Sequence, residues 1–409
     1  MTDKKNVIFL TMSTRNIADR GIYSDLLRKF LAEGWRVFVV APRERRQGLS
    51  TELTEQGGVH ILGVKTLNLQ KTSVIEKGIG QVLVESQYKQ AIKKHLKGVK
   101  FDLILYSTPP ITFPKVIIFL KRNNPNAKTY LLLKDIFPQN AVDLGMMRKT
   151  GVKGAIYHYF RRKEKKLYGL SDYIGCMSPA NVKYILKHNP EIAPNKVEVA
   201  PNSFDLIKNE LEPDKEKGKK LDIRSKYGLP KEKPVFIYGG NLGKPQGIPF
   251  LIECLQANSL RTDCHFLIIG TGTELPKLKK WQAENSPKNV TVMDGLPKKE
   301  YDELVQTCDV GLIFLDHRFT IPNFPSRMLT YLENRMPILC ATDSNTDMGK
   351  ISEENGFGYW CESNSVEAFT SILDRMIRAN RIEMGEKGYE FLCKNYLIEN
   401  TYNAIVKHV

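Results

Sequence analysis

Residues 234–255 read PVFIYGGNLGKPQGIPFLIECL, which is an apolar strand, a glycine-rich turn and the start of a helix. Gly239, Gly240 and Gly243 allow the backbone to turn sharply and to come close to a ligand. The free N–H groups and the positive dipole end of the following helix favour an anion. The stretch therefore predicts a strand–turn–helix unit with a phosphate-sized recess at its turn.

A second cluster in the same half of the chain, residues 323–339, reads NFPSRMLTYLENRMPIL. Ser326 is expected to cap a helix, and Arg327 in the first turn can fork onto phosphate oxygens. The alternative is that Arg327 is an ordinary surface arginine of that helix. Two anion sites in one α/β half indicate a diphosphate ligand, such as a nucleotide-sugar.

Outward from these clusters, strand-like and helix-like runs alternate along the chain and indicate doubly wound parallel sheets. The 409 residues are enough for two domains. A polar stretch at 209–233 has linker-like composition and marks the boundary. We therefore expect an N-terminal domain over 1–205, a C-terminal domain over 206–385 and a final helix over 386–409 near the boundary. The two domains are expected to leave a cleft between facing strand ends.

The net positive charge of the chain comes entirely from its first half. Residues 1–205 carry 34 Lys and Arg against 17 Asp and Glu, a net charge of +17, whereas residues 206–409 carry 27 against 28. This asymmetry indicates an anionic surface or polymer partner for the first domain only. Two basic stretches, 152–168 and 88–100, fit contact with anionic lipid, the first as an amphipathic helix. The alternative for each is a solvated helix packed on its own domain.

Several classes of protein are disfavoured. The seven cysteines are scattered singly without metal-ligand spacing, which fits reduced core thiols in the cytoplasm. No signal peptide and no membrane-spanning run is evident. No Asp-x-Asp pair occurs and the histidines show no ligand spacing, so neither a metal nor a cofactor is expected.

The chain resembles the retaining family 4 glycosyltransferases of the GT-B fold, most closely the fucosamine-transferase-like branch of bacterial capsule, O-antigen and exopolysaccharide synthesis. The resemblance rests on AEGWRVFVVAP, YSTPPITF, LLLKDIFPQNAVDLG, APNSFD, YGGNLGKPQGI, FLIIGTGTELPKLKKW, VTVMDGLPKKEYDELVQTCDVGLIFL and FPSRMLTYLENRMPIL. It implies two Rossmann-like domains, a basic one that binds the acceptor and a second that binds the nucleotide-sugar.

The resemblance also implies a set of donor-binding residues. They are Gly240, Asn241, Gly243, Lys244, Gln246, Gly272, Gly295, Leu296, Ser326, Arg327 and Thr330. The chain departs from the family at two places. Asn241 and Gln246 stand where the family usually has an Arg and a Lys for the diphosphate, and Pro322 and Thr330 stand where it has paired glutamates. Arg327, Lys244 and backbone amides are therefore expected to hold the diphosphate, with Arg327 catalytic.

The acceptor side is expected at the strand ends of the first domain. The predicted residues are Arg20, Gly21, Tyr23, Ser107, Thr108 and Asp135. Asp135 follows a strand, where a carboxylate can orient or deprotonate an acceptor hydroxyl. The alternative is that Asp135 caps the next helix.

Together these features predict a retaining hexosyltransferase. It would move an N-acetylated hexosamine or deoxyhexosamine from a nucleotide-diphosphate donor, with UDP favoured, to a polyprenyl-diphosphate-linked saccharide. It would lie peripherally on the inner face of the cell membrane and bind no nucleic acid. The alternatives are a nucleotide-sugar 2-epimerase of the same fold, a membrane-bound scaffold without activity, and a nucleic-acid-binding protein.

Overall fold

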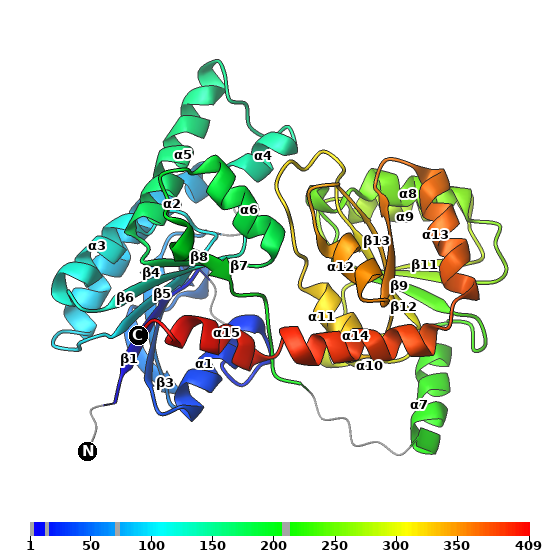
Figure 1. Ribbon diagram of the computed structural model, residues 1–409, viewed down its shortest axis with the longest axis horizontal. Coiled ribbons are helices and arrows are strands. Elements are labelled where there is room, and N and C mark those ends of the chain that lie inside the picture. Colours follow the sequence, from blue (N-terminus) through cyan, green and yellow to red (C-terminus); the bar gives the residue numbers. More distant parts are fainter. Residues whose placement is uncertain (1–3, 13–15, 70–73, 207–212) are drawn as a thin grey trace. The chain divides into compact units, whose positions relative to one another are not determined.

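Strands and helices alternate along both halves of the chain in the computed structural model, which describes residues 4–12, 16–69, 74–206 and 213–409. The chain divides into two units: unit 1 comprises Met1–Asp205 and Tyr396–Val409, and unit 2 comprises Leu206–Asn395. Figure 1 shows each unit as a sheet covered by helices on both faces. The expected doubly wound architecture is therefore confirmed.

Unit 1 contains an eight-stranded sheet in the order β3-β4-β2-β1-β5-β6-β7-β8. All neighbouring strands are parallel except β3, which forms an antiparallel edge with β4. The strands are β1 (Asn6–Leu10), β2 (Arg36–Glu44), β3 (Glu52–Gln56), β4 (Val59–Thr66), β5 (Leu103–Ser107), β6 (Lys128–Leu133), β7 (Tyr173–Cys176) and β8 (Val197–Val199).

The helices of unit 1 are α1 (Ile22–Ala32), α2 (Val74–His95), α3 (Pro114–Asn123), α4 (Gln139–Asp143), α5 (Val152–Leu170), α6 (Pro179–His188) and α15 (Ile398–Val406). Helices α1 and α15 cover one face, where Phe30 and Tyr402 pack with Phe9 and Val39 in a buried apolar core. Helix α3 packs beside both α2 and α5 on the other face (Figure 1). The first turns of α5 project past the sheet (Figure 1).

Unit 2 contains a fully parallel six-stranded sheet in the order β11-β10-β9-β12-β13-β14. The strands are β9 (Val235–Asn241), β10 (His265–Thr271), β11 (Val290–Asp294), β12 (Val310–Phe314), β13 (Ile338–Thr342) and β14 (Gly358–Glu362). The helices are α7 (Pro213–Lys226), α8 (Ile248–Ala257), α9 (Leu275–Asn285), α10 (Lys298–Val305), α11 (Arg327–Glu333), α12 (Met348–Glu354), α13 (Val366–Arg378) and α14 (Arg381–Asn395).

Two expectations about the segments around unit 2 differ from the structure. The polar stretch expected as a linker contains α7, because buried Arg224 fastens it by donating to Asp309 and to the carbonyl of Thr307. The final helix expected over 386–409 is instead two helices, α14 in unit 2 and α15 in unit 1. In both cases contacts that are distant in sequence set the boundary.

Strand order identifies where a ligand would bind in each sheet. Neighbouring connections run in opposite directions from β1 and β5 in unit 1, and from β9 and β12 in unit 2. Ligands of open α/β sheets bind outside the carboxyl ends of the strands at such a switch point. The glycine-rich turn follows β9 and the Arg327 segment follows β12. The two sequence clusters therefore meet at the switch point of unit 2.

Candidate functional site

Arg327 places a positive charge against the glycine-rich turn of unit 2. A Cβ atom at Gly240 would lie 3.8 Å from Cζ and Nη2 of Arg327, so the guanidinium lies directly against this glycine. The guanidinium carbon also lies 4.3 Å from the centroid of the Tyr238 ring. Gly240 has φ +121°, a backbone conformation that glycine adopts without strain.

The guanidinium of Arg327 has unused hydrogen-bonding capacity. Its Nη1 atom is buried and has no hydrogen-bond partner. Within the described ranges, no carboxylate forms an ion pair with it. A buried charge without a partner is costly, and such groups are usually paired in proteins. The arrangement therefore suits an anionic ligand that supplies the missing acceptor.

The segment that carries Arg327 is fixed by burial and by one hydrogen-bond network. Ile321 and Phe324 are buried, and the amide of Asn323 donates to Thr346 Oγ1 at 3.0 Å. Thr346 in turn donates to Asp343 at 2.9 Å. Ser326 does not cap α11 as expected: its backbone is already helical and its side chain makes no capping hydrogen bond. Arg327 is thus positioned by the loop rather than by a capped helix.

Asn241 and Gln246 bind each other, although they were predicted to bind the donor. Asn241 Nδ2 donates to Gln246 Oε1 at 3.0 Å, and the Gly243 amide donates to the same oxygen at 3.1 Å. These bonds close the turn after β9 and occupy the Gly243 amide. Lys244 is exposed beside them. Arg327 of α11 brings a guanidinium to the same strand end.

The remaining predicted donor residues line the same edge of the sheet. Gly272 is required by packing, since a Cβ atom there would lie 2.2 Å from the carbonyl oxygen of Leu242. Gly295 is exposed and Leu296 is partly buried after β11. Thr330 lies one turn after Arg327 on α11. Gly272 is thus required by packing. For Gly295, Leu296 and Thr330, contact with the donor stays a prediction.

Asp135 is the central group at the carboxyl edge of unit 1. Asn140 Nδ2 donates to both of its carboxylate oxygens, at 2.8 and 2.9 Å. Burial raises the pKa of Asp135 to about 6, and hydrogen bonds from the Ile136 amide and Asn140 partly oppose this shift. The carboxylate does not cap α4. A carboxyl group with this pKa can accept a proton near neutral pH.

Some predicted acceptor residues are brought together around Asp135. Thr108 Oγ1 donates to the Asp135 carbonyl at 3.1 Å and accepts the Lys134 amide at 3.0 Å. Burial raises the pKa of the Tyr23 hydroxyl, and the Ser107 side chain beside it partly opposes the shift. Ser107 and Thr108 are consecutive and buried. Tyr23, Ser107, Thr108 and Asp135 therefore form one group at the switch point of unit 1.

Arg20 and Gly21 are engaged elsewhere in unit 1. Arg20 donates to the carbonyl of Asp205 at 2.7 and 3.1 Å, and its guanidinium lies 4.0 Å from the Phe204 ring centroid. The Gly21 amide donates to Asp25 at 2.9 Å. Asp25 also accepts the Asp205 amide. These contacts fasten the last residues of the unit before the chain enters unit 2, which the sequence prediction missed.

Sequence reasoning also missed the aromatic groups around Arg327. Tyr238 directly precedes the glycine pair, Tyr301 lies on α10 and Tyr331 lies on α11. The Gly239 amide donates to Tyr331 Oη at 3.0 Å. A buried lysine of unit 1 was missed as well: burial lowers the pKa of Lys134 to about 7, and its amine donates to the Ala200 carbonyl at 3.1 Å. All three tyrosines lie inside stretches quoted from the sequence, but no local pattern marks them as neighbours of Arg327.

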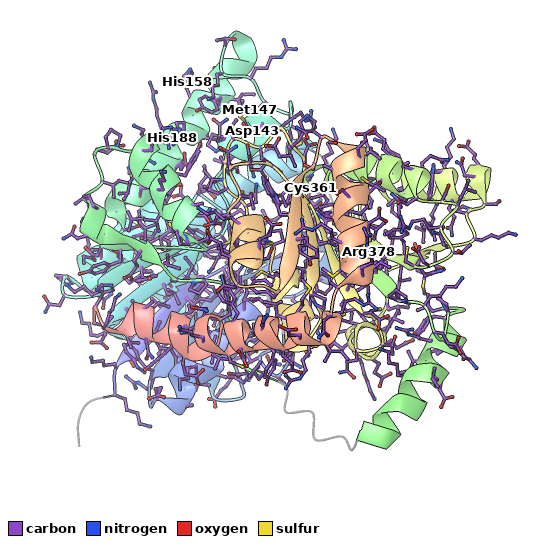
Figure 2. All side chains as sticks on the ribbon, turned by 45° about the vertical axis from the view of Figure 1, so that its right-hand side comes forward. Asp143, Met147, His158, His188, Cys361 and Arg378 are labelled. Atoms are coloured by element: carbon purple, nitrogen blue, oxygen red, sulfur yellow. The ribbon has the colours of Figure 1, made fainter. Side chains whose placement is uncertain are left out.

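Histidine and cysteine side chains contribute little to either edge. His158 and His188 are exposed, as expected, and Figure 2 shows both toward the outside of unit 1. Of the seven free cysteines, six are buried, including Cys361, which Figure 2 shows inside unit 2. In the part of the chain that the structure describes, no three His, Cys, Asp or Glu side chains gather to hold a metal ion.

Comparisons with known proteins agree with this geometry. Residues 219–391 match the family described as "Glycosyl transferases group 1". The chain is 24% identical over 330 residues to a protein of Pseudomonas aeruginosa named a probable glycosyltransferase, WbjE, covering 80% of this chain and 78% of that one. It is 27% identical over 154 residues to a protein of Escherichia coli K12 named a colanic acid biosynthesis glycosyl transferase, WcaI, covering 36% and 37%.

A solved structure extends the likeness to the full length of the fold. Alr3699/HepE of Anabaena in complex with UDP superposes with a TM-score of 0.68 at 11% identity, covering 98% of this chain and 99% of that one. At this identity the likeness concerns the fold alone. Together with the two doubly wound sheets, it shows the two-domain GT-B fold, and the family match identifies residues 219–391 as a group 1 glycosyltransferase domain.

Proposed function

We propose that this enzyme transfers a sugar, with retention of configuration, from a nucleoside-diphosphate donor held by unit 2 to an acceptor presented by unit 1. The observation that carries the proposal is the buried Nη1 atom of Arg327, which has no partner and lies at the glycine-rich turn. A diphosphate supplies the acceptors and the negative charge that this guanidinium lacks.

Each unit has one chemical task in this reaction. The bond between the anomeric carbon and the diphosphate breaks, and the acceptor oxygen bonds to that carbon on the same face. Arg327 stabilises the charge that develops on the leaving diphosphate, which is usually the largest catalytic contribution. Asp135 orients the acceptor hydroxyl and takes its proton, and its pKa of about 6 keeps it ionised at neutral pH.

UDP is the favoured nucleotide, and the transferred sugar is proposed to be an N-acetylated hexosamine or a deoxyhexosamine. The fold likeness to HepE, whose structure contains UDP, supports the nucleotide. The resemblance to the fucosamine-transferase-like branch supports the sugar. Gly295 and Leu296, open at the edge after β11, are proposed to meet the nucleobase.

A lipid-linked acceptor is supported by the outer surface of unit 1. On the projecting half of α5, Ile156 and Tyr159 are 53% and 44% exposed, and on α2 Val82 is 62% exposed. Lys163 Nζ of α5 forms an ion pair with Glu85 Oε2 of α2 at 3.3 Å, so the two helices lie close together there. Exposed apolar residues beside basic ones fit the interface of an anionic membrane.

The second basic stretch, 88–100, surrounds a hollow of about 630 Å³ between the ends of α2 and α3. Apolar side chains, Phe101 and Phe119 among them, line it together with Lys93, Lys94, Lys97 and Lys100, and the lining contains no acidic residue. Each lysine near an anionic membrane contributes about 1 kcal/mol of attraction. Both basic stretches are therefore proposed as membrane contacts.

The acceptor is proposed to be a polyprenyl-diphosphate-linked saccharide at the inner face of the cell membrane, in the synthesis of a bacterial surface polysaccharide. The name of the relative WcaI, which refers to colanic acid biosynthesis, supports this role. No described helix is long and apolar enough to cross a bilayer. The exposed apolar and basic residues of α5 and α2 are what support attachment through the surface of unit 1.

The test is a comparison of Arg327→Met with Arg327→Lys in binding and transfer. Titration calorimetry with UDP, GDP, ADP and dTDP identifies the nucleotide, and transfer of the labelled sugar to a lipid-linked saccharide measures turnover. Losing hydrogen bonds to a charged group costs roughly 1.5–3 kcal/mol, so Arg327→Met should weaken binding by about 10- to 100-fold. Arg327→Lys keeps the charge and should retain part of the affinity.

Three results would contradict the proposal. Wild-type affinity in Arg327→Met would exclude the guanidinium as the diphosphate ligand. Nucleotide binding without transfer to any acceptor would favour the scaffold without activity. Interconversion of a free nucleotide-sugar without transfer would favour the 2-epimerase.

A further inference from the structure

Tyr301 on α10 brings a second polar group to the turn that Arg327 contacts. A Cβ atom at Gly239 would lie 1.9 Å from Tyr301 Oη, so the phenol hydroxyl lies directly against this glycine. At the next residue, Gly240, the Arg327 guanidinium lies 3.8 Å from the position that a Cβ atom would take. A hydroxyl and a guanidinium therefore lie near two consecutive residues at the carboxyl end of β9.

The Tyr301 hydroxyl differs from those of the two neighbouring tyrosines. Tyr238 Oη donates to the Asn241 carbonyl at 2.9 Å, and Tyr331 Oη accepts the Gly239 amide at 3.0 Å. No residue within the described ranges hydrogen-bonds the Tyr301 hydroxyl. Burial raises its pKa, which the Arg327 guanidinium partly opposes, so the hydroxyl keeps its proton at neutral pH. Tyr331 is fully buried and Tyr301 only partly, so within the described ranges Tyr301 is the partly exposed phenol of the three whose hydroxyl has no hydrogen-bond partner.

Two unused donors thus lie at the same turn, the Tyr301 hydroxyl and the buried Nη1 of Arg327. Phosphate oxygens accept several hydrogen bonds at once, and bonds from a donor to a charged oxygen are about twice as strong as neutral ones. The two polar side chains that would serve a ligand within the turn itself, Asn241 and Gln246, are engaged with each other. Apart from the exposed Lys244 of the turn, the hydrogen-bond donors at this strand end therefore come from α10 and α11.

We infer that Tyr301 is a donor-binding residue whose hydroxyl donates a hydrogen bond to the diphosphate that Arg327 holds. This inference rests on the proposed function of Arg327. It gives unit 2 a phosphate site with two hydrogen-bonding side chains, one a cation and the other a neutral hydroxyl. The hydroxyl adds direction to the binding without adding charge, because an O–H bond must point at the oxygen that it serves.

Tyr301→Phe tests the inference, because the ring remains and only the hydroxyl is removed. The matched control is Tyr359→Phe on β14: Tyr359 also lies beside an arginine, with Arg375 Cζ 4.0 Å from its ring centroid, but at the far edge of the sheet. The probes are the nucleoside diphosphate that binds the wild type best, its nucleoside and inorganic pyrophosphate.

The expected result is a roughly 10- to 100-fold loss of affinity for the diphosphate in Tyr301→Phe. Affinity for pyrophosphate should fall in parallel, whereas affinity for the nucleoside and the melting temperature should not change. Tyr359→Phe should bind all three as the wild type does. This pattern separates a phosphate contact from a packing role, which would affect the nucleoside and the stability as well.

Unchanged diphosphate affinity in Tyr301→Phe would overturn the inference, and a loss in Arg327→Met would then leave the proposed function standing. An equal loss for nucleoside and diphosphate would also overturn it, because the ring would then be acting on the base. If both variants bind like the wild type, or the wild type binds no nucleoside diphosphate, the proposed function fails together with the inference.

Discussion

The groups proposed to act on the ligands at the two sheets carry opposite kinds of charge. In unit 2 the proposed group is the Arg327 guanidinium, which within the described ranges has no acidic partner. In unit 1 it is the Asp135 carboxyl group, which Asn140 holds and whose pKa burial raises to about 6. An arginine stays charged at every physiological pH, whereas such a carboxyl group gains or loses a proton near neutrality.

This difference indicates a division of tasks within one fold. A permanent positive charge suits a ligand with permanent negative charge, such as a diphosphate. A carboxyl group that titrates near neutrality suits a proton in transfer. We therefore propose that the same strand–turn–helix architecture serves anion binding at one edge and proton chemistry at the other. Four experiments test or refine this contrast.

Replacing Asp135 by Asn should have the largest effect. The amide cannot accept the acceptor proton, and we expect turnover to fall by roughly 10²–10⁴-fold, as is usual for the loss of a general base. The affinity for the nucleoside diphosphate should not change, since Asp135 belongs to unit 1. Steady-state transfer and nucleotide titration measure the two quantities separately.

Asp143→Asn is the control for this substitution. Asp143 is a partly buried carboxylate on α4, the same short helix that carries Asn140, and it accepts a hydrogen bond from Gln139 at 2.6 Å. Figure 2 shows it beside Met147. Turnover of Asp143→Asn should stay close to the wild-type value. Equal activity of Asp135→Asn and Asp143→Asn would show that the edge of unit 1 performs no proton chemistry.

Gly270→Ala should disturb the edge of unit 2 without touching a charge. Its Cβ atom would lie 1.8 Å from the Gly240 carbonyl oxygen, so the turn beneath Arg327 must shift. Overpacking of this kind costs roughly 1–3 kcal/mol, which corresponds to an affinity loss of about 5- to 150-fold if binding requires the original turn.

Gly169→Ala on α5 is its counterpart in unit 1, because nothing lies within 4 Å of the added atom. Alanine in a helix is favoured over glycine by roughly 0.5–1 kcal/mol, so this variant should melt slightly higher and bind nucleotide normally. The melting temperature and the nucleotide affinity are measured for both Gly270→Ala and Gly169→Ala. Normal nucleotide affinity in Gly270→Ala would show that binding of the nucleotide does not depend on the conformation of this turn.

The two edges should differ in their response to pH. Because the pKa of Asp135 is raised to about 6, its ionised form decreases as the pH falls below that value. Turnover should then fall about tenfold per pH unit. Affinity for the nucleotide-sugar, whose diphosphate takes up no proton in this range, should stay level because Arg327 remains charged. A fall of both quantities at the same pH would contradict the division of tasks.

The smallest effect is expected at the basic surface of unit 1. Lys97→Gln, at the hollow between α2 and α3, should weaken retention on anionic vesicles by roughly tenfold or less, since each lysine contributes about 1 kcal/mol. Lys280→Gln, at another exposed lysine on α9 of unit 2, should not alter retention. Sedimentation with anionic and neutral vesicles measures both, and equal losses would indicate attraction by overall charge.

The sequence by itself predicted the two doubly wound sheets and the edges at which ligands are proposed to bind. Buried parallel strands are continuous apolar runs, and glycine-rich turns mark the strand ends, so both signals are local. Arg327 and Asp135 were proposed as site residues in the same way, since each immediately follows a recognisable segment. That α7 is a helix was missed, because buried Arg224 anchors it to residues far away in the sequence.

Tertiary structure decided which of the predicted residues are available to a ligand. Asn241 and Gln246 bind each other, and Arg20 holds the backbone of Asp205. In contrast, Arg327 and Tyr301 come from different helices to the same two glycines. Local sequence specifies which groups can donate or accept, whereas only three-dimensional proximity determines which of them are already paired. The free donors at the turn after β9 therefore become visible only in the folded chain.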